Sequence, residues 1–261
     1  ANVLGASGLL HTGMANGKIK AAYDITPTLR AAYTFGYWQN DGNSNVETYT
    51  QASGQPTYAG QSGFASGAYD LAQRHSSHSF TLRTDRKRDW DLELVASTYR
   101  FDEDTQRSPG SASASGTSYG SAGRVAVLDG TGWSTLDAKG MWRPGGQISR
   151  HTVSAGGHLD WYSLKNTTFN TPDWTQPRNF SGVFSEGDGK TRTAALWAQD
   201  AWYVTPDLKL TVGGRWEDVH HPAHPPRRQP RHLGQSEGRQ HPDPVERRRR
   251  ECVHRRRPDL V

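Results

Sequence analysis

The chain has 261 residues, a formal net charge of +5, one cysteine and a hydrophobic fraction of 33%. It contains no run of about 18 apolar residues, which excludes a transmembrane helix, and the lone Cys252 excludes a disulfide scaffold or a cysteine-rich zinc module. The charge is uneven, because residues 220–261 hold 11 Arg against five acids, whereas residues 1–219 hold 20 basic and 21 acidic residues. We therefore divide the chain into a body, 1–219, and a basic tail, 220–261.

Apolar and polar residues alternate along the body, which is the period-2 pattern of strands with one apolar and one polar face. Near the start, for example, Ile19, Ala21 and Tyr23 alternate with Lys20 and Asp24. Apolar residues do not recur at helical spacing, so no helix is predicted. In chain order the pattern predicts eight strands, at about residues 17–26, 29–41, 74–85, 90–104, 132–142, 148–164, 191–204 and 208–219.

The connections between these strands alternate strictly between short and long. Four are tight turns supplied with Pro, Gly or Asp, and the three others, at 42–73, 105–131 and 165–190, are rich in Gly, Ser, Asn and Thr. This alternation places every long loop at one end of the sheet. An outer-membrane β-barrel has that arrangement, with short turns on the periplasmic side and long loops outside.

Aromatic residues gather near both ends of the predicted strands. Because amphipathic rings prefer the head-group level of a bilayer, we expect two aromatic girdles. The alternative is a soluble all-β protein whose aromatic residues fill a core. The girdle near the short turns would comprise Tyr23, Trp90, Trp142, Trp202 and Tyr203, and the girdle near the long loops Tyr37, Trp38, Tyr99, Phe101, Trp133, Trp161, Tyr162 and Trp216.

Residues 194–218 carry a more specific pattern. A strand with Trp197-Ala198-Gln199-Asp200 leads into the turn Thr205-Pro206-Asp207-Leu208, and a strand with Leu210-Thr211-Val212-Gly213-Gly214-Arg215-Trp216-Glu217 follows. This segment resembles a hairpin of TonB-dependent outer-membrane receptors, and residues 24–41 look like a second such hairpin. With the strand pattern, the resemblance covers about residues 14–219.

The resemblance implies an all-β, antiparallel up-and-down transmembrane β-barrel in the outer membrane of a Gram-negative bacterium. Receptors of this family import scarce ligands, most often ferric siderophores, and the partner TonB pulls on an N-terminal plug. The family barrel has about 22 strands, whereas about eight are predicted here and no plug or TonB box is recognisable before residue 17. We therefore expect an incomplete barrel, a fragment that does not transport alone, with outer-membrane lipid, the ligand and, for the full-length receptor, TonB as partners.

Two other functions compete with this hypothesis. The chain could be a complete small eight-stranded outer-membrane barrel with a structural or adhesive role. It could also be an outer-membrane protease or phospholipase, which needs a convergent acid–His or Ser–His set. No such set is evident, so we predict no enzyme, no catalytic residue, no cofactor and no nucleic-acid partner for the body.

Family ligands are bound by plug and outer-loop residues, so aromatic and basic residues in the long loops are the candidates for binding an anionic or aromatic chelate. Two weaker sites were weighed against them. His75 and His78 are expected to share a face but are too few for a closed zinc site, and residues 102–104 could hold a hard cation but are better explained as a solvated acidic strand end. The ligand-binding candidates are Tyr49, Tyr58, Arg107, Tyr119, Trp174 and Arg178.

The tail allows three interpretations. The arginine runs at 247–250 and 255–257 could bind nucleic acid or an anionic surface, but no aromatic residue accompanies them for base stacking. His220, His221 and His224 could bind a metal, weakly. The favoured hypothesis is a frameshift, because the composition jumps to Arg, Pro and His just where a family member would enter another loop; a natural disordered tail is the next.

Overall fold

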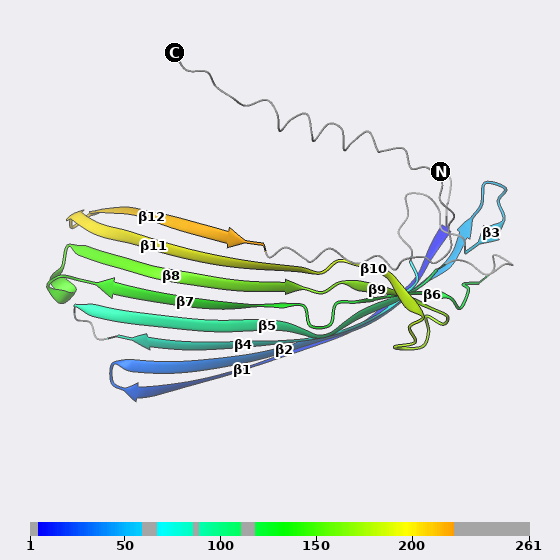
Figure 1. The fold of residues 1–261 in the computed structure, drawn as a ribbon, viewed down its shortest axis with the longest axis horizontal. Coiled ribbons are helices and arrows are strands. Elements are labelled where there is room, and N and C mark those ends of the chain that lie inside the picture. The colour runs from blue at the N-terminus through cyan, green and yellow to red at the C-terminus, as the bar shows by residue number, and fades with distance from the viewer. Residues whose placement is uncertain (1–4, 59–66, 86–88, 111–117, 222–261) are drawn as a thin grey trace, which may run out of the picture. The chain divides into compact units, whose positions relative to one another are not determined.

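The computed structural model describes residues 5–58, 67–85, 89–110 and 118–221. They form one antiparallel sheet in which eight long strands lie side by side in chain order (Figure 1). This confirms the predicted all-β, up-and-down fold. The eight strands are β1 (Gly5–Thr26), β2 (Leu29–Thr50), β4 (Tyr69–Thr84), β5 (Trp90–Pro109), β7 (Gly132–Trp142), β8 (His151–Leu164), β11 (Gly189–Thr205) and β12 (Leu208–His220).

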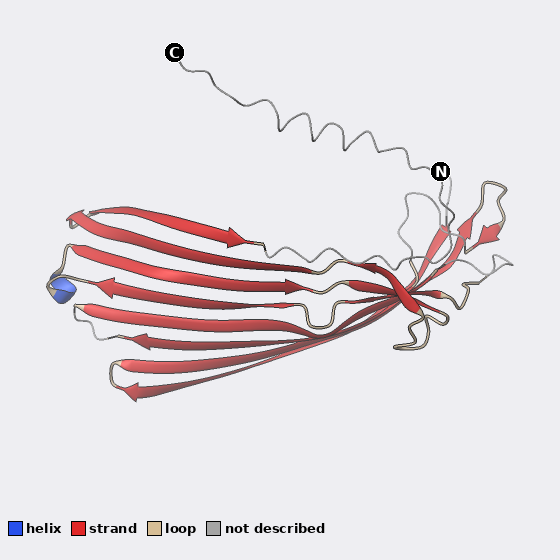
Figure 2. Cartoon of the chain, in the orientation of Figure 1, coloured by secondary structure: helices blue, strands red, loops and turns tan. Residues whose placement is uncertain are grey.

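Short turns join the strands at one end of the sheet, and the long connections lie at the other end (Figure 1). In the β11–β12 turn, the Leu208 amide donates to Oγ1 of Thr205 at 3.0 Å, while Pro206 has no amide hydrogen to extend the ladder. Gly145 and Gly146 take positive φ values of 90° and 71° at the β7–β8 turn, where a short 3-10 helix, Gly146–Ile148, is the helical element among the described residues (Figure 2).

The strand register sorts the side chains onto two faces, because directly opposed residues in an antiparallel pair project to the same side. Leu94 lies opposite Leu82 and Ala138, and the same transverse row continues through Gly157 to Leu196. We call this side the apolar face. Glu93 lies opposite Arg83 and Lys139 on the other side, which we call the polar face.

An aromatic belt lies on the apolar face at the short-turn end. Trp90 stacks on Trp142 with 5.8 Å between ring centroids, and Trp202 stacks on His151 at 5.5 Å. Tyr23 also lies on this face, opposite Ala31, but Tyr203 lies opposite Lys209 on the polar face, so the girdle predicted at this end is wrong for Tyr203. The girdle predicted at the long-loop end is wrong in part, because the register places Trp161 and Trp216 on the apolar face but Trp38, Tyr99, Phe101 and Trp133 on the polar face.

The long connections contain strands that the alternation did not predict. The short strand β6 pairs on one side with the last five residues of β5, 105–109, and on the other side with β9. Strand β9 also pairs with β10. These pairings tie the second and third long connections together. Val125 of β6 is 1% exposed, which makes this tie one of the most buried places in the described chain. The added strands are β3 (Pro56–Thr57), β6 (Gly123–Val127), β9 (Thr167–Thr171) and β10 (Gly182–Glu186).

Within the described residues, no helix has the length and apolarity needed to cross a bilayer. Strand β12 ends at His220, one residue beyond the predicted body. The remaining tail predictions, including the arginine runs, the frameshift and the disordered tail, concern residues 222–261, which lie outside the described part of the chain.

Candidate functional site

Three of the six predicted ligand-binding residues come together at the loop end. Tyr49 lies near the end of β2, where β3 pairs with it, and is 8% exposed. The rings of Tyr58 and Tyr119 meet edge to face at 5.2 Å. Burial, and then the neighbouring Tyr49 and Tyr58, raise the pKa of Tyr119 above its ordinary value of 10.0. The result is a cluster of phenols formed by two connections that are far apart in the sequence.

Arg107 and Trp174 form a second group. The Arg107 guanidinium donates through Nη1 to the carbonyl oxygen of Thr175 at 2.6 Å, and its Nη2 lies 3.3 Å from a carboxylate oxygen of Asp70. The Trp174 amide donates to the carbonyl oxygen of Ser121 at 2.9 Å. Arg107 therefore holds the third long connection against β4 and β5, which gives it a positioning role beside any contact with a ligand.

Arg178 is exposed and lies in the same connection as Trp174. Its backbone φ is 59°, and in the described part of the chain Arg178 is the non-glycine residue with a positive φ. No contact between described residues joins Arg178 to the tyrosine cluster or to Arg107, so the structure does not bring the sixth candidate to the others.

An aromatic ladder on the polar face was missed from the sequence. Trp38 and His75 lie 4.9 Å apart, His75 stacks on Phe101 at 3.9 Å, and Tyr99 stacks on Trp133 at 4.5 Å. Closeness to strand ends predicts a girdle position for the four rings other than His75. The alternation of the strand could have shown this. Trp38 falls at an even position, whereas the apolar residues of its strand fall at odd positions, so Trp38 projects to the opposite face.

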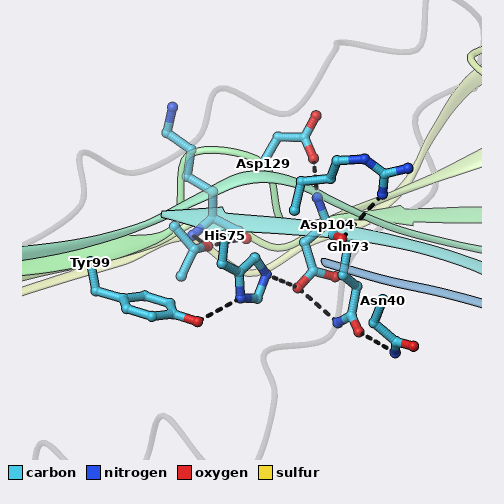
Figure 3. A network of polar contacts seen from close by, with 9 residues as sticks. Asn40, Gln73, His75, Tyr99, Asp104 and Asp129 are labelled. Carbon is cyan, nitrogen blue, oxygen red and sulfur yellow. Dashed lines mark hydrogen bonds and ion pairs between the residues drawn. The ribbon is translucent and has the colours of Figure 1, made fainter. Parts of the chain in front are cut away.

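His75 is also the centre of a buried polar network (Figure 3). Its Nε2 lies 2.9 Å from Oδ2 of Asp104, and its Nδ1 lies 2.9 Å from the hydroxyl of Tyr99. Gln73 donates through Nε2 to the same Asp104 oxygen at 3.0 Å and accepts from Nδ2 of Asn40 at 3.0 Å. His75 and Asp104 are each 6% exposed, so Asp104 is not the solvated strand end that the sequence suggested.

A β-bulge explains why Asp104 reaches this network. The register passes from Arg74 opposite Glu103 to His75 opposite Phe101, which leaves Asp102 without a partner. The extra residue reverses the alternation, so Asp104 shares the polar face with Gln73 and His75. The three acids 102–104 are thereby separated, which counts against a shared cation site.

The prediction that His75 and His78 share a face is wrong. Residues three apart in a regular strand project to opposite faces, and His78 lies opposite Phe35 on the apolar face. There its Nδ1 is 2.6 Å from the hydroxyl of Tyr33. Among the described residues, no group of three or more His, Cys, Asp or Glu side chains is placed to hold a metal ion.

Comparisons with known proteins agree with this fold. A complex of FpvAI with pyocin S2 matches with 13% identity and a TM-score of 0.56 over 82% of this chain and 32% of that one. The ferripyoverdine receptor of the Pseudomonas aeruginosa outer membrane, bound to ferripyoverdine, matches with 14% identity and a TM-score of 0.54 over 81% of this chain and 31% of that one. The chain thus spans about a third of the length of these structures.

A search of curated proteins finds no match to the sequence. At 13–14% identity, the structural matches show a shared fold. The sequence itself gives the family, because the model described as "TonB dependent receptor-like, beta-barrel" matches residues 18–231, which is most of the chain. The chain belongs to the TonB-dependent receptor β-barrel family.

Proposed function

We propose that this chain forms part of the barrel wall and outer loops of an outer-membrane receptor that takes up a ferric siderophore or a similar scarce chelate. The observation that carries the proposal is the family match together with the phenol cluster of Tyr49, Tyr58 and Tyr119 at the loop end. The similar P. aeruginosa structure holds ferripyoverdine, which is a ligand of this chemical class.

The cluster has suitable chemistry for such a ligand. Phenol rings stack on aromatic groups, and their hydroxyls donate hydrogen bonds to anionic oxygens. Burial raises the pKa of Tyr119 above its ordinary value of 10.0. Its hydroxyl is therefore protonated at neutral pH, like that of an ordinary tyrosine, and can donate to an anionic chelate. Arg107 fixes the neighbouring connection that carries Trp174.

In this proposal the chain, with its eight long strands, represents part of a barrel that has about 22 strands in the family. Transport coupled to TonB then belongs to the whole receptor, and the last described strand that this chain adds to the barrel wall is β12, which ends at His220. A complete eight-stranded barrel is not favoured, because closure would pair β1 with β12, and these strands lie at opposite ends of the sheet path.

The test is ligand binding by the purified protein in detergent. Quenching of tryptophan fluorescence would be titrated with a panel of ferric catecholate, hydroxamate and mixed-ligand siderophores. We expect one class to bind and the double variant Tyr58→Ala/Tyr119→Ala to weaken it by about tenfold, the loss of two aromatic contacts. The matched control is Tyr23→Ala, an exposed residue of the apolar face near the short turns. Binding that is absent for every class, or equal in both variants, would count against the proposal.

A further inference from the structure

The apolar face ends in basic residues at the loop end of the sheet. One transverse row runs from Arg100 through Gly132 and Ser163 to Lys190. The row below it joins Ser134, Trp161, Arg192 and His220. Below these two rows the same face carries Ala96, Leu94 and Leu92 on β5, so the change from apolar to basic is abrupt.

These two rows line a groove of about 690 Å³, which lies within the range of small-molecule sites. No side chain fills the groove between Arg100 and Ser163 of β8, because the residue between them in the row is Gly132. A side chain at Gly132 is excluded, since a Cβ would lie 2.4 Å from the carbonyl oxygen of Tyr99. The groove therefore depends on a close approach of β5 and β7 that leaves space between the basic side chains.

The charge of the groove is available to a ligand. Arg100, Lys190 and Arg192 are exposed, and none of the three forms an ion pair with another described residue. The Arg192 guanidinium lies over the ring of Trp161 at 5.9 Å. Asp102 is the carboxylate among the described residues that line the groove, so the cations are in excess.

The position of the groove along the strand fits the edge of a bilayer. Ten residues separate Trp90 in the aromatic belt from Arg100, roughly 34 Å of strand. A strand tilted by about 40° crosses roughly 25 Å of bilayer over that length, the height of the apolar band of an outer-membrane barrel. The aromatic belt therefore marks one head-group level, and the groove with Trp161 marks the other.

We propose that this groove binds the phosphate-bearing head group of an outer-leaflet lipid. Arg100, Lys190 and Arg192 contact the phosphate oxygens, where the planar guanidinium of arginine donates two parallel hydrogen bonds. Trp161 packs on the lipid at the boundary between head group and acyl chains. The inference rests on the proposed outer-membrane location but not on the proposed siderophore ligand, which the phenol cluster of Tyr49, Tyr58 and Tyr119 would bind.

The test uses the purified protein in micelles of an uncharged detergent. Native mass spectrometry would measure binding of diphosphoryl lipid A, its dephosphorylated form, phosphatidylcholine and inorganic phosphate. We expect diphosphoryl lipid A to bind best and the variant Arg100→Gln/Lys190→Gln/Arg192→Gln to bind it roughly a hundredfold more weakly, about tenfold or less per charge removed. The matched control is Lys18→Gln/Lys20→Gln/Lys139→Gln, which removes the same charge from the polar face.

The outcomes of this experiment distinguish failure of the lipid site from failure of the proposed siderophore binding. Equal weakening in both triple variants, or wild-type binding that ignores the lipid phosphates, would overturn the lipid site. Displacement of the lipid by inorganic phosphate at equal concentration would assign the groove to free phosphate and overturn it as well. Siderophore binding and strand circular dichroism should be unchanged in the groove variant. A wild-type protein that binds a siderophore but does not prefer the phosphorylated lipid would reject the lipid site alone.

Discussion

At the scale of single residues, the most constrained group in the described chain is the His75–Asp104 pair. One carboxylate oxygen of Asp104 accepts from both His75 and Gln73, and Phe101 covers the imidazole. A buried donor that loses its acceptor costs more than an average hydrogen bond contributes, because the group stays desolvated in the folded state. Removal of the Asp104 side chain alone therefore leaves both donors, of His75 and of Gln73, without their acceptor.

We expect Asp104→Ala to lower the free energy of unfolding by about 1–3 kcal/mol, since it leaves the donors of His75 and Gln73 unsatisfied. Guanidinium unfolding of the protein in lipid vesicles, followed by tryptophan fluorescence, measures this change. The control is Asp24→Ala, which breaks the exposed ion pair with Arg30 and should leave the midpoint nearly unchanged. Equal shifts in the two variants would show that burial of the network contributes nothing.

The residue scale is also where sequence reasoning was weakest. The alternation pattern places side chains on faces correctly only while the register is continuous, and the bulge at Asp102 carries no signature in the sequence. Alternation alone therefore predicts one solvated group for the acids 102–104, which the bulge separates. The His75–His78 error was avoidable, because three-residue spacing alone puts the two rings on opposite faces.

At the scale of elements, glycines determine how closely two strands pack. Gly156 lies opposite Lys139 and Trp197. A Cβ at Gly156 would meet the Trp197 ring at 2.8 Å and the carbonyl oxygen of Ala138 at 2.5 Å. Gly214 sits two strands away with no atom within 4 Å of such a Cβ. The two positions therefore differ in packing while sharing the same residue type.

Gly156→Ala should destabilise the sheet by about 1–3 kcal/mol, the usual cost of overpacking, because the backbone oxygen of Ala138 cannot move without breaking the β7–β8 ladder. Gly214→Ala should be tolerated. Thermal unfolding of both variants, read from the loss of strand circular dichroism, gives the comparison. A stable Gly156→Ala protein would mean that β7 and β8 can separate at this point.

The eight long strands and the short turns within the described residues were predictable, because period-2 patterning and turn residues are local signals. The short strands of the long connections were not. The pairing of β6 with β9 joins residues 40 to 48 positions apart, and each segment is only five residues long. Such pairing is decided by tertiary contact, and the same is true of the meeting of Tyr58 with Tyr119.

At the scale of the whole sheet, the two faces impose opposite demands. The apolar face presents Leu92 and Leu196 with 60% and 63% of their surfaces exposed, whereas the polar face carries charged ladders and the aromatic rings. Large exposed apolar areas of this kind mark a surface meant for another apolar phase. In the proposed barrel that phase is the hydrocarbon of the membrane.

Leu94→Arg and Val95→Arg are adjacent substitutions that test this assignment. Leu94 lies near the middle of the apolar rows, and an arginine there should reduce insertion by about 2–4 kcal/mol. Val95 lies opposite Thr81 and Asp137 on the polar face, so its arginine should be accepted. Insertion into phosphatidylcholine vesicles is followed by heat-modifiable migration in gels. The reverse result would mean that the polar face meets the lipid.

The tie between β6 and β9 has a consequence for grafting loops between related receptors. A chimera that exchanges only the connection at 110–131 would present a new segment to the old β9, and five register pairs, from Gly123–Thr171 to Val127–Thr167, would lose their match. The second and third connections must therefore be exchanged together. In the proposed receptor, the two connections would then be replaced as one block and not loop by loop.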